Sequence, residues 1–445
     1  MNWKQLISNK RFGLEELHAK RKDDRTEFQR DYDRLIFSAP FRRLQNKTQV
    51  FPLPGSIFVH NRLTHSLEVS CVGRSLGNNV AKELLLLHPE LQQECPHLSE
   101  IGSIISAACL AHDLGNPPFG HSGEKAIGTY FSEGNGLKLK EKLTPNEWED
   151  ITHFEGNANA FRLLTHQFNG RRKGGFVMTY STLASIVKYP FSSQWAHKKA
   201  KFGFFLSEEA DFIKIADELG LIRLSKEGEP LKYARHPLVY LVEAADDICY
   251  QMMDIEDAHK LKLLTTQETK ELMLRFFDET KQDHILQICD MVDDINEQIA
   301  YLRSSVIGKL IDECTKTFVK NEEAILNGTF EGSLIKHISQ PVKEAYDFCA
   351  ELSFRRIYRS KDVLDIELAG FRVISTLLDL MIEAVLSPDK AYSQLLINRV
   401  SDQYDIHSST FYGKVQAVLD YISGMTDVYA LDLYRKINGN SLPAV

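Results

Sequence analysis

The sequence predicts a mainly α-helical protein. Apolar residues recur at intervals of three and four along most of the chain, which is the period of an amphipathic helix. Strict alternation of apolar and polar residues, the period of a half-buried strand, is scarce. FVMTY at residues 176–180 follows a Gly-Gly pair and is the segment most compatible with a strand, in a small β-hairpin.

The helices of the first 260 residues follow from their apolar stripes and end signals. Residues 101–111 are expected to form a short, largely apolar helix, and residues 237–257 a long one. SEEADFIKIADELG at 207–220 begins with a serine cap and an acidic first turn and stops at Gly220. Another long helix is expected after Arg62, where one stripe contains Leu67, Val69, Val72, Leu76, Val80 and Leu84.

The C-terminal third continues in the same pattern, with helices expected over residues 285–306, 364–386 and 413–435. No repeat, low-complexity tract or clean linker divides the chain. We expect a boundary between residues 260 and 280, because polar residues of metal-site type lie before it and ordinary amphipathic helices follow it.

The composition is that of a soluble globular protein, with 43% apolar and 26% charged residues. The net charge of −8 argues against a protein that is basic overall, although basic patches occur at residues 42–47 and 197–201. The seven cysteines are scattered singly, as reduced thiols are. No apolar run is long enough to span a bilayer, and the N-terminus lacks a signal-peptide core, so a cytoplasmic location is expected.

The stretch ACLAHDLGNPPFGHSGE at residues 108–124 concentrates polar chemistry at the end of an apolar run. The run leads into His112 and Asp113, and a Gly/Asn/Pro-rich turn then prevents the helix from continuing. Both side chains are therefore expected at the mouth of a cleft. Imidazole with carboxylate is a ligand mix that suits Zn, Mn, Fe and similar divalent ions.

Two other helices supply candidate ligands for the same ion. His65 shares the apolar stripe of its helix, and Asp246 lies inside an apolar helix, where an unpartnered carboxylate is costly. Asp246, Tyr250 and Asp254 follow one another at intervals of four and share one helical face. Taken singly, His65 fits a core histidine and Asp246 a partner of an arginine. The whole set, in the order His, His-Asp, Asp, favours a metal centre.

The residues around these positions resemble the deoxyguanosine triphosphate triphosphohydrolase (dGTPase) family, within the HD superfamily of metal-dependent phosphohydrolases. Seven blocks between residues 20 and 260 stand in the family's order. They are RDYDRLIFSAPFRRLQNKTQVFP (30–52), NRLTHSLEV (61–69), AHDLGNPPFGHSGE (111–124), HFEGNANAFRLL (153–164), TYSTLASIVKYP (179–190), KFGFFLSE (201–208) and EAADDICY (243–250).

The resemblance implies an HD-domain helical core within residues 1–265 and additional helices, residues 266–445, packed on it. It also implies a single divalent cation, such as Mn²⁺ or Mg²⁺. The ligands would be His65, His112, Asp113 and Asp246. Enzymes of the family release deoxynucleoside and intact tripolyphosphate, so we expect hydrolysis of a dNTP, dGTP above all, at the α-phosphorus.

His121 and Glu124 are the candidates for proton transfer in such a reaction. A histidine suits protonation of the departing O5′ atom, because its pKa is nearest the operating pH. Glu124 lies three residues further on, where a carboxylate can orient the imidazole. The alternative for His121 is a helix-capping or surface residue.

A triphosphate needs local cations in this acidic chain. Arg62 precedes His65 by three residues and shares its helical face. The resemblance places Lys188, Tyr189 and Lys201 at the phosphates. The alternative for Arg62 is a partner of an aspartate, and the alternative for Lys188 is a solvated surface lysine.

The sugar is expected at Tyr250, whose ring would leave no room for a 2′-hydroxyl. Asp254 would take the 3′-hydroxyl, and Gln45 would reach the sugar. Tyr250 has the alternative of a core residue, and Glu155 either lines the cleft or caps a helix.

Two other functions stay open at this point. One is another HD phosphohydrolase, a nucleotidase or phosphodiesterase. The other is a nucleotide-responsive or single-stranded nucleic-acid-binding regulator with a vestigial site. The resemblance further implies a homo-oligomer, a tetramer or hexamer, with the C-terminal helices as candidate assembly surfaces. The sequence identifies neither the residues that read the base nor the native metal nor an effector site.

Overall fold

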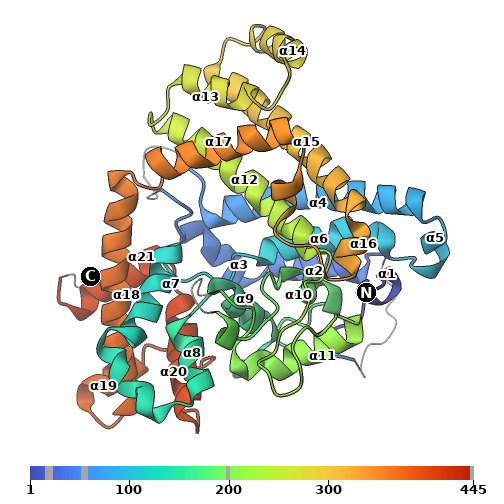
Figure 1. The fold of residues 1–445 in the computed structure, drawn as a ribbon. Helices are drawn as coiled ribbons and strands as arrows, with labels where there is room; N and C mark the ends of the chain where they lie inside the picture. Colours follow the sequence, from blue (N-terminus) through green and yellow to red (C-terminus); the bar gives the residue numbers. More distant parts are fainter. Residues whose placement is uncertain (16–23, 52–58, 197–200, 441–445) are drawn as a thin grey trace.

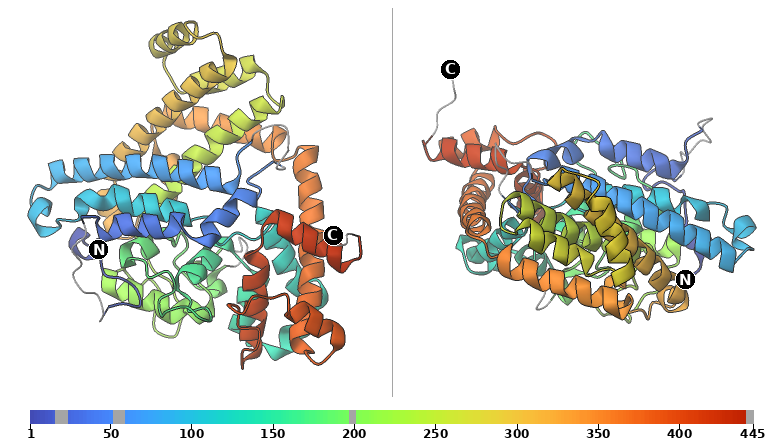
Figure 2. Two further views of the ribbon diagram at one scale, coloured as in Figure 1. Left: turned by 180° about the vertical axis from the view of Figure 1, so that it is seen from behind. Right: turned by 90° about the horizontal axis from the view of Figure 1, so that it is seen from above.

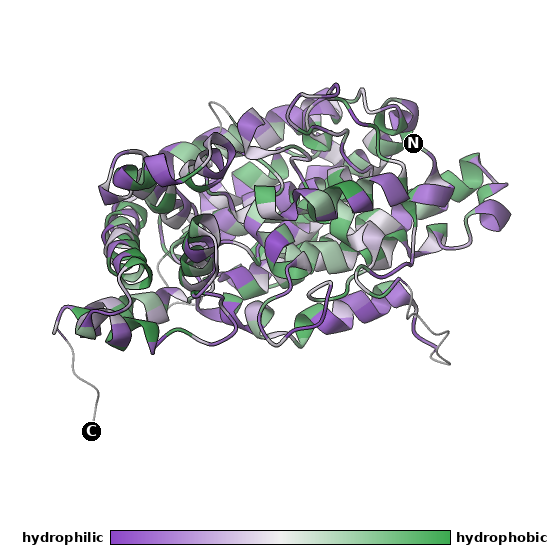
Figure 3. Cartoon of the chain, turned by 90° about the horizontal axis from the view of Figure 1, so that it is seen from below, coloured by the Kyte–Doolittle hydropathy of each residue, from purple (hydrophilic) through white to green (hydrophobic). Residues whose placement is uncertain are grey.

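The computed structural model describes residues 1–15, 24–51, 59–196 and 201–440. Its described residues form helices joined by turns, with isolated β-bridges and no strand. The predicted mainly α-helical fold class is confirmed. Figure 3 shows hydrophobic and hydrophilic residues side by side on most helices, as amphipathic helices require.

The helices that build the centre of the molecule come from the first 260 residues (Figure 1). The longest are α4 (Arg62–Leu87) and α12 (Val239–Lys260). The others are α1 (Trp3–Leu6), α2 (Glu27–Ile36), α3 (Ala39–Arg43), α5 (Leu91–Glu94), α6 (Ile101–Ala111), α7 (Gly120–Ser132), α8 (Pro145–Thr152), α9 (Gly156–Thr165), α10 (Tyr180–Ile186) and α11 (Glu209–Leu219).

The remaining helices flank this centre on two sides. Figure 2 shows α15 (Ile295–Lys320) and α17 (Gln340–Arg356) beside α12, whereas the last helices gather around α7 and α8. These last helices are α18 (Lys361–Leu386), α19 (Ala391–Ile397), α20 (Phe411–Ser423) and α21 (Asp427–Ile437). Helices α13 (Thr266–Leu274) and α14 (Glu279–Cys289) lie furthest out, and α16 (Glu322–Leu326) lies against the N-terminal segment (Figure 1).

Two hydrophobic clusters correspond to these sides. The first contains Leu76 of α4, Ile105 of α6 and Ile248 of α12, together with residues of α15. The second joins Ile127 of α7 to Leu377 of α18 and to residues of α20 and α21. The C-terminal helices thus contribute to both clusters. The division of the chain at residue 265 stays a prediction.

Helices α4 and α6 approach each other closely, which sets the distance between the residues at their ends. A Cβ atom on Gly77 of α4 would lie 2.7 Å from the Cα atom of Gly102 on α6, so only glycine fits there. Helix α4 begins at a capping box. The Asn61 side chain accepts a hydrogen bond from the Thr64 backbone N–H, and the Thr64 hydroxyl accepts one from the Asn61 backbone N–H. Helix α6 is buried along almost its whole length.

Several sequence predictions fail at helix ends. Residues 176–180 form no hairpin strand: Val177 has a positive φ of 56°, and Thr179 caps α10, pairing with Arg11 only in an isolated bridge. Ser207 lies in a 3₁₀ turn and does not cap α11, although Gly220 ends that helix as expected. The expected helix over 285–306 is two helices, because Asp294 caps α15.

The expected helix over 413–435 is likewise interrupted. Helix α20 ends at Ser423, and the Thr426 hydroxyl accepts from the Tyr429 backbone to start α21. Before α15 and before α21, the apolar pattern of the sequence continues across the break. In each case a single polar residue, Asp294 or Thr426, caps the new helix. The other long helices, α4, α12 and α18, lie where their patterns predict them.

Candidate metal centre and its pocket

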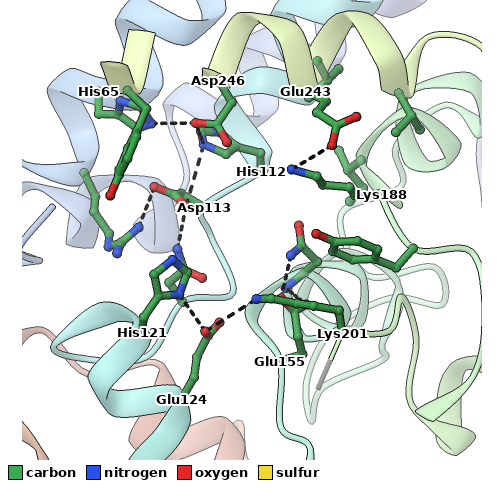
Figure 4. Close-up of a pocket in the computed structure, with 18 of the residues that line it drawn as sticks. His65, His112, Asp113, His121, Glu124, Glu155, Lys188, Lys201, Glu243 and Asp246 are labelled. Atoms are coloured by element: carbon green, nitrogen blue, oxygen red, sulfur yellow. Dashed lines mark hydrogen bonds and ion pairs between the residues drawn. The ribbon is translucent and has the colours of Figure 1, made fainter. Parts of the chain in front are cut away.

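The predicted metal ligands come together from three helices (Figure 4). Helix α4 supplies His65, the end of α6 supplies His112 and Asp113, and α12 supplies Asp246. Asp246 Oδ1 lies 3.1 Å from His65 Nε2 and 3.6 Å from His112 Nε2. One ligand atom each of His65, His112 and Asp113 lies within 4.8 Å of the others, close enough to share an ion.

One ring nitrogen of His112 is held by the backbone, and the other is directed at this cluster. Its Nδ1 atom lies 2.6 Å from the backbone carbonyl oxygen of Cys109, which can only accept, so Nδ1 carries a proton. The Nε2 atom is buried and has no hydrogen-bond partner among the described residues. A buried ring nitrogen next to two carboxylates, with the other nitrogen bonded to a carbonyl oxygen, is the arrangement of a metal-binding histidine.

The electrostatics of the cluster fit a cation. Burial alone raises the pKa of a carboxyl group, but Arg62 and the two histidines lower the pKa of Asp113 to about 2. The histidines hold the pKa of Asp246 well below its usual value against the same effect of burial. Burial lowers the pKa of His112, yet the carboxylates of Asp113 and Asp246 raise it to about 9. A cation bound here would take the place of the proton on His112 Nε2, and the resulting set of ionised oxygens and imidazole nitrogens suits a divalent ion.

A pocket of about 250 Å³ opens over the cluster. It contains most of the residues that the sequence singled out, on elements from α4 to α12. Its lining includes Gln49, Arg62, His65, His112, Asp113, Asn116, His121, Glu124, Glu155, Asn157, Lys188, Tyr189, Lys201, Glu243, Asp246 and Tyr250.

His121 and Glu124 form a hydrogen-bonded pair at the pocket edge, on the first turn of α7. His121 Nδ1 lies 2.8 Å from Glu124 Oε2, and the other oxygen of Glu124 accepts from the Gly156 backbone at 2.8 Å. The His121 side chain is 70% exposed and that of Glu124 10%, so the carboxylate is fixed while the ring reaches the open pocket. Burial raises the pKa of Glu124, but His121 and Lys201 bring it below its usual value.

Each predicted phosphate-binding cation already has a carboxylate partner. Arg62 Nη1 lies 2.7 Å from Asp113, which bears out the aspartate pairing considered for it. Lys188 Nζ lies 3.2 Å from Glu243. Lys201 Nζ lies 2.6 Å from Glu155, a residue that lines the pocket and also caps α9. Lys188 and Lys201 point their amino groups into the pocket from the side opposite His65 (Figure 4), and Arg62 also lines the pocket.

Two of the predicted sugar contacts do not reach the pocket. Gln45 is exposed and does not line it. Asp254 lies one turn beyond Tyr250 and accepts a hydrogen bond from Tyr358 Oη at 2.5 Å. Tyr250 does line the pocket, and its ring stacks on that of Tyr358, with centroids 5.7 Å apart and planes inclined at 27°.

The sequence analysis did not single out every residue at the pocket or behind it, and Gln49 and Tyr358 are examples. Gln49 lines the pocket, and its buried Oε1 atom has no hydrogen-bond partner among the described residues. Gln49 lies four residues after Gln45 in the same sequence block, at residues 30–52. The sequence did not indicate which of the two side chains points into the pocket. Tyr358, which supports Tyr250 from beneath, lies in a C-terminal segment without any motif.

The basic patches of the sequence are not exposed surfaces as a whole. Lys47 is buried, and its Nζ atom donates to the backbone carbonyl oxygens of Asn116 at 2.5 Å and Ser423 at 2.8 Å. Burial lowers the pKa of Lys47 to about 7. Most of the second patch, residues 197–200, lies outside the described residues. Within the described residues, no helix has the length and apolar composition that a membrane span requires.

Comparison with known proteins places this site in a class. Residues 62–220 match the HD domain, and residues 337–436 match the phosphohydrolase-associated domain. The first match contains three of the predicted metal ligands, His65, His112 and Asp113. The fold and the site thus define an HD-domain phosphohydrolase.

Relatives that match over the full length narrow this class. The chain is 37% identical to a deoxyguanosinetriphosphate triphosphohydrolase-like protein of Pseudomonas aeruginosa, over 100% of both chains. It is 38% identical to a protein of that name from Synechocystis sp., over 99% of this chain and 100% of the other. A deoxyguanosinetriphosphate triphosphohydrolase of Yersinia enterocolitica is 30% identical, over 92% of this chain and 93% of the other. The chain belongs to the HD-domain dGTPase family.

Proposed function

We propose that this protein hydrolyses deoxynucleoside triphosphates, dGTP above all, to deoxynucleoside and tripolyphosphate. The observation that carries the proposal is the pocket itself. It combines a His/His/Asp/Asp cluster, a hydrogen-bonded His–Glu pair and three cationic side chains within one cavity. A reaction at the α-phosphorus needs these three kinds of group together.

The cluster is proposed to hold one divalent cation, Mn²⁺ or Mg²⁺, through His65, His112, Asp113 and Asp246. When bound, the ion supplies Lewis acidity toward phosphorus and favours ionisation of a water molecule. The protein's part is to fix the ligands. The Cys109 carbonyl sets the tautomer of His112, and Arg62 keeps Asp113 ionised.

His121 is proposed to donate the proton that O5′ of the nucleoside takes up as it leaves. Its Nδ1 atom is engaged by Glu124, so Nε2 is the nitrogen available to the substrate. The Glu124 carboxylate stabilises the charged imidazole before transfer. Its own hydrogen bond to the Gly156 backbone keeps the pair in place.

Arg62, Lys188 and Lys201 are proposed to bind the phosphate oxygens, with Tyr189 beside Lys188. Each cation now faces a carboxylate, so a triphosphate would share or replace those partners. Tyr250 is proposed to pack against the deoxyribose and to exclude a 2′-hydroxyl. For Gln45 and Asp254 a direct sugar contact has no support in the pocket geometry, whereas Gln49 has an unpaired oxygen there.

A homo-oligomer, tetramer or hexamer, is part of the proposal. Its support is an apolar stripe on α18, where Leu364 is 45% exposed, Leu368 72% and Phe371 37%. Such residues recur at helical spacing on one face, as assembly surfaces require. Binding of single-stranded nucleic acid has weaker support, because the buried amine of Lys47 is not available to phosphates.

The experiment that tests the function is a product assay with each of the four dNTPs in the presence of Mn²⁺ or Mg²⁺. Tripolyphosphate and deoxynucleoside in equal amounts are expected, with dGTP the best substrate. Release of diphosphate or orthophosphate would instead indicate another HD phosphohydrolase, a nucleotidase or phosphodiesterase. Binding of oligonucleotides without turnover and without bound metal would indicate a regulator with a vestigial site.

A further inference from the structure

One carboxylate of the C-terminal helices contacts two separate segments of the pocket. Asp427, the first residue of α21, is 7% exposed. Its Oδ2 atom accepts from the Thr48 backbone N–H at 2.8 Å, and its Oδ1 atom accepts from the Phe119 backbone N–H at 2.9 Å. Thr48 immediately precedes Gln49, and Phe119 precedes His121 by two residues.

The end of α20 holds the same segments through a second contact. Lys47 Nζ donates both to the carbonyl oxygen of Ser423, the last residue of α20, and to the carbonyl oxygen of Asn116. The Asn116 side chain in turn donates to Asp113 Oδ1 at 2.5 Å. The end of α20 and the start of α21 are therefore connected to the back of the pocket at residues 47, 48, 116 and 119.

Phe119 needs such support, because its backbone is strained. It precedes α7 in the left-handed region, with a φ of 63°, and no side chain caps the helix there. Glycine or asparagine is the usual occupant of this conformation. Contacts with the surrounding structure must therefore stabilise the left-handed conformation of Phe119. One of them is the hydrogen bond from the Phe119 backbone N–H to Asp427.

The side chain of Phe119 is held from the other direction by α18. A Cβ atom on Gly370 would lie 2.7 Å from both Cβ and Cγ of Phe119, so α18 leaves a gap that the aromatic residue occupies. The residue that begins the His121 helix is thus enclosed by two C-terminal elements, α21 at its amide and α18 at its ring.

We propose that Asp427 and Gly370 are positioning residues that hold the His121–Glu124 pair against the pocket. In this proposal the C-terminal helices complete the active site, although none of their residues contacts the reacting groups. Asp427 also sets the direction of Gln49 through Thr48. The inference rests on the proposed function, because it assigns a role at the same site.

The test compares two variants that reach Phe119 from opposite sides. In Asp427→Asn, the amide oxygen can accept from only one of the two N–H groups, and the amide nitrogen faces the other. In Gly370→Ala, the new methyl group pushes the Phe119 side chain while Asp427 stays intact. The matched controls are Asp432→Asn, at an outward ion pair with Lys436 on the same helix, and Gly308→Ala, where a Cβ atom meets nothing within 4 Å.

We expect Gly370→Ala to lower kcat for dGTP by roughly tenfold or more, the scale of a misplaced catalytic group. KM and Mn²⁺ affinity, measured by calorimetry, should stay near those of the wild type. Asp427→Asn should lower kcat and also raise KM, because it loosens Gln49 as well. In hydrogen exchange, the Phe119 amide of Asp427→Asn should exchange faster than in the wild type, while both controls match the wild type.

Several outcomes would overturn the inference. One is an active wild type whose kcat both variants retain. Another is a loss of kcat that comes only with a matching loss of metal affinity or of folded protein. If the wild type hydrolyses no dNTP, the proposed function fails. The hydrogen-exchange experiment still tests whether Asp427 holds the Phe119 backbone in place. Unchanged exchange at Phe119 in folded Asp427→Asn then rejects it.

Discussion

His121 Nδ1 lies 2.8 Å from Glu124 Oε2, and this contact decides which ring nitrogen faces the pocket. If His121 is the general acid, its removal should slow turnover without disturbing the metal. His121→Ala is therefore expected to lower kcat by roughly 10²–10⁴-fold, the usual contribution of a general acid, with Mn²⁺ affinity unchanged. Steady-state kinetics and calorimetry on the same preparation check both halves.

The matched control is His153→Ala, since His153 bonds within its own helix end and does not line the pocket. This control should behave as the wild type. A folded His121→Ala protein that has lost its ion would show that His121 is a ligand and would reverse the division of roles.

Two adjacent aspartates on α12 give a sharp test of the metal ligands. Asp246 contacts His65 and His112, whereas Asp247 does not line the pocket. Asp246→Asn is expected to weaken Mn²⁺ binding beyond the roughly 10–100-fold that loss of an outer partner costs, and turnover should disappear with it. Asp247→Asn should keep the ion. Equal metal content of the two variants after dialysis would contradict the assignment.

Gln49 and Gln45 form another matched pair, four residues apart. Gln49 presents an unpaired oxygen in the pocket, while Gln45 is exposed. If Gln49 bonds the substrate, Gln49→Ala removes about 1 kcal/mol of binding, and KM for dGTP should rise roughly fivefold. Gln45→Ala should leave KM unchanged. The reverse result would restore the contact that the sequence analysis expected.

The centre of the site was predictable because its geometry follows from helical periodicity. His65 lies on the buried stripe of α4, and Asp246 and Tyr250 share one face of α12, so each direction can be worked out from spacing alone. His112 and Asp113 stand where α6 must stop. The family resemblance then indicated Lys188 and Lys201 as phosphate-binding candidates, and both line the same pocket.

What the sequence could not provide depends on irregular backbone and on distant contacts. Gln49 follows a short 3₁₀ turn, so no helical period distinguishes it from Gln45. Asp254 satisfies the periodic rule but is engaged by Tyr358, 104 residues away. The breaks before α15 and α21 depend on single capping residues, which the apolar pattern passes over.

Substitution of Tyr358 tests whether this residue supports Tyr250, the side chain proposed to pack against the deoxyribose. The Tyr358 ring stacks on Tyr250 and its hydroxyl donates to Asp254. Tyr358→Phe keeps the ring and should change the preference for dGTP over GTP little. Tyr358→Ala removes the support, so Tyr250 should give way and the preference should fall by roughly fivefold, as for a lost aromatic pair of about 1 kcal/mol. Competition assays with both nucleotides measure it, and equal preferences in the two variants would reject the supporting role.

From the burial of His236 we expect the folded protein to lose stability in acid, independently of the metal-binding pocket. His236 is buried, its Nε2 atom lies 3.2 Å from the Leu6 carbonyl oxygen, and its Nδ1 atom accepts from the Leu238 backbone N–H. Burial lowers its pKa from 6.5 to about 4, although the Leu6 contact acts in the opposite direction. The folded protein therefore keeps this ring neutral over a range in which the unfolded chain takes up a proton.

The sign of the effect follows from this difference in proton uptake. Above pH 6.5 neither state holds the proton on His236, and its contribution to stability is complete. As the pH falls from 6.5 toward 4, the unfolded state gains a proton that the folded state does not, and the free energy of unfolding decreases. The slope approaches about 1.4 kcal/mol per pH unit, or roughly 3 kcal/mol in all. His236→Gln should flatten the pH dependence measured by denaturant unfolding, whereas His284→Gln, at an exposed position of α14, should not. A variant at position 236 with the slope of the wild type would show that other groups cause the acid sensitivity.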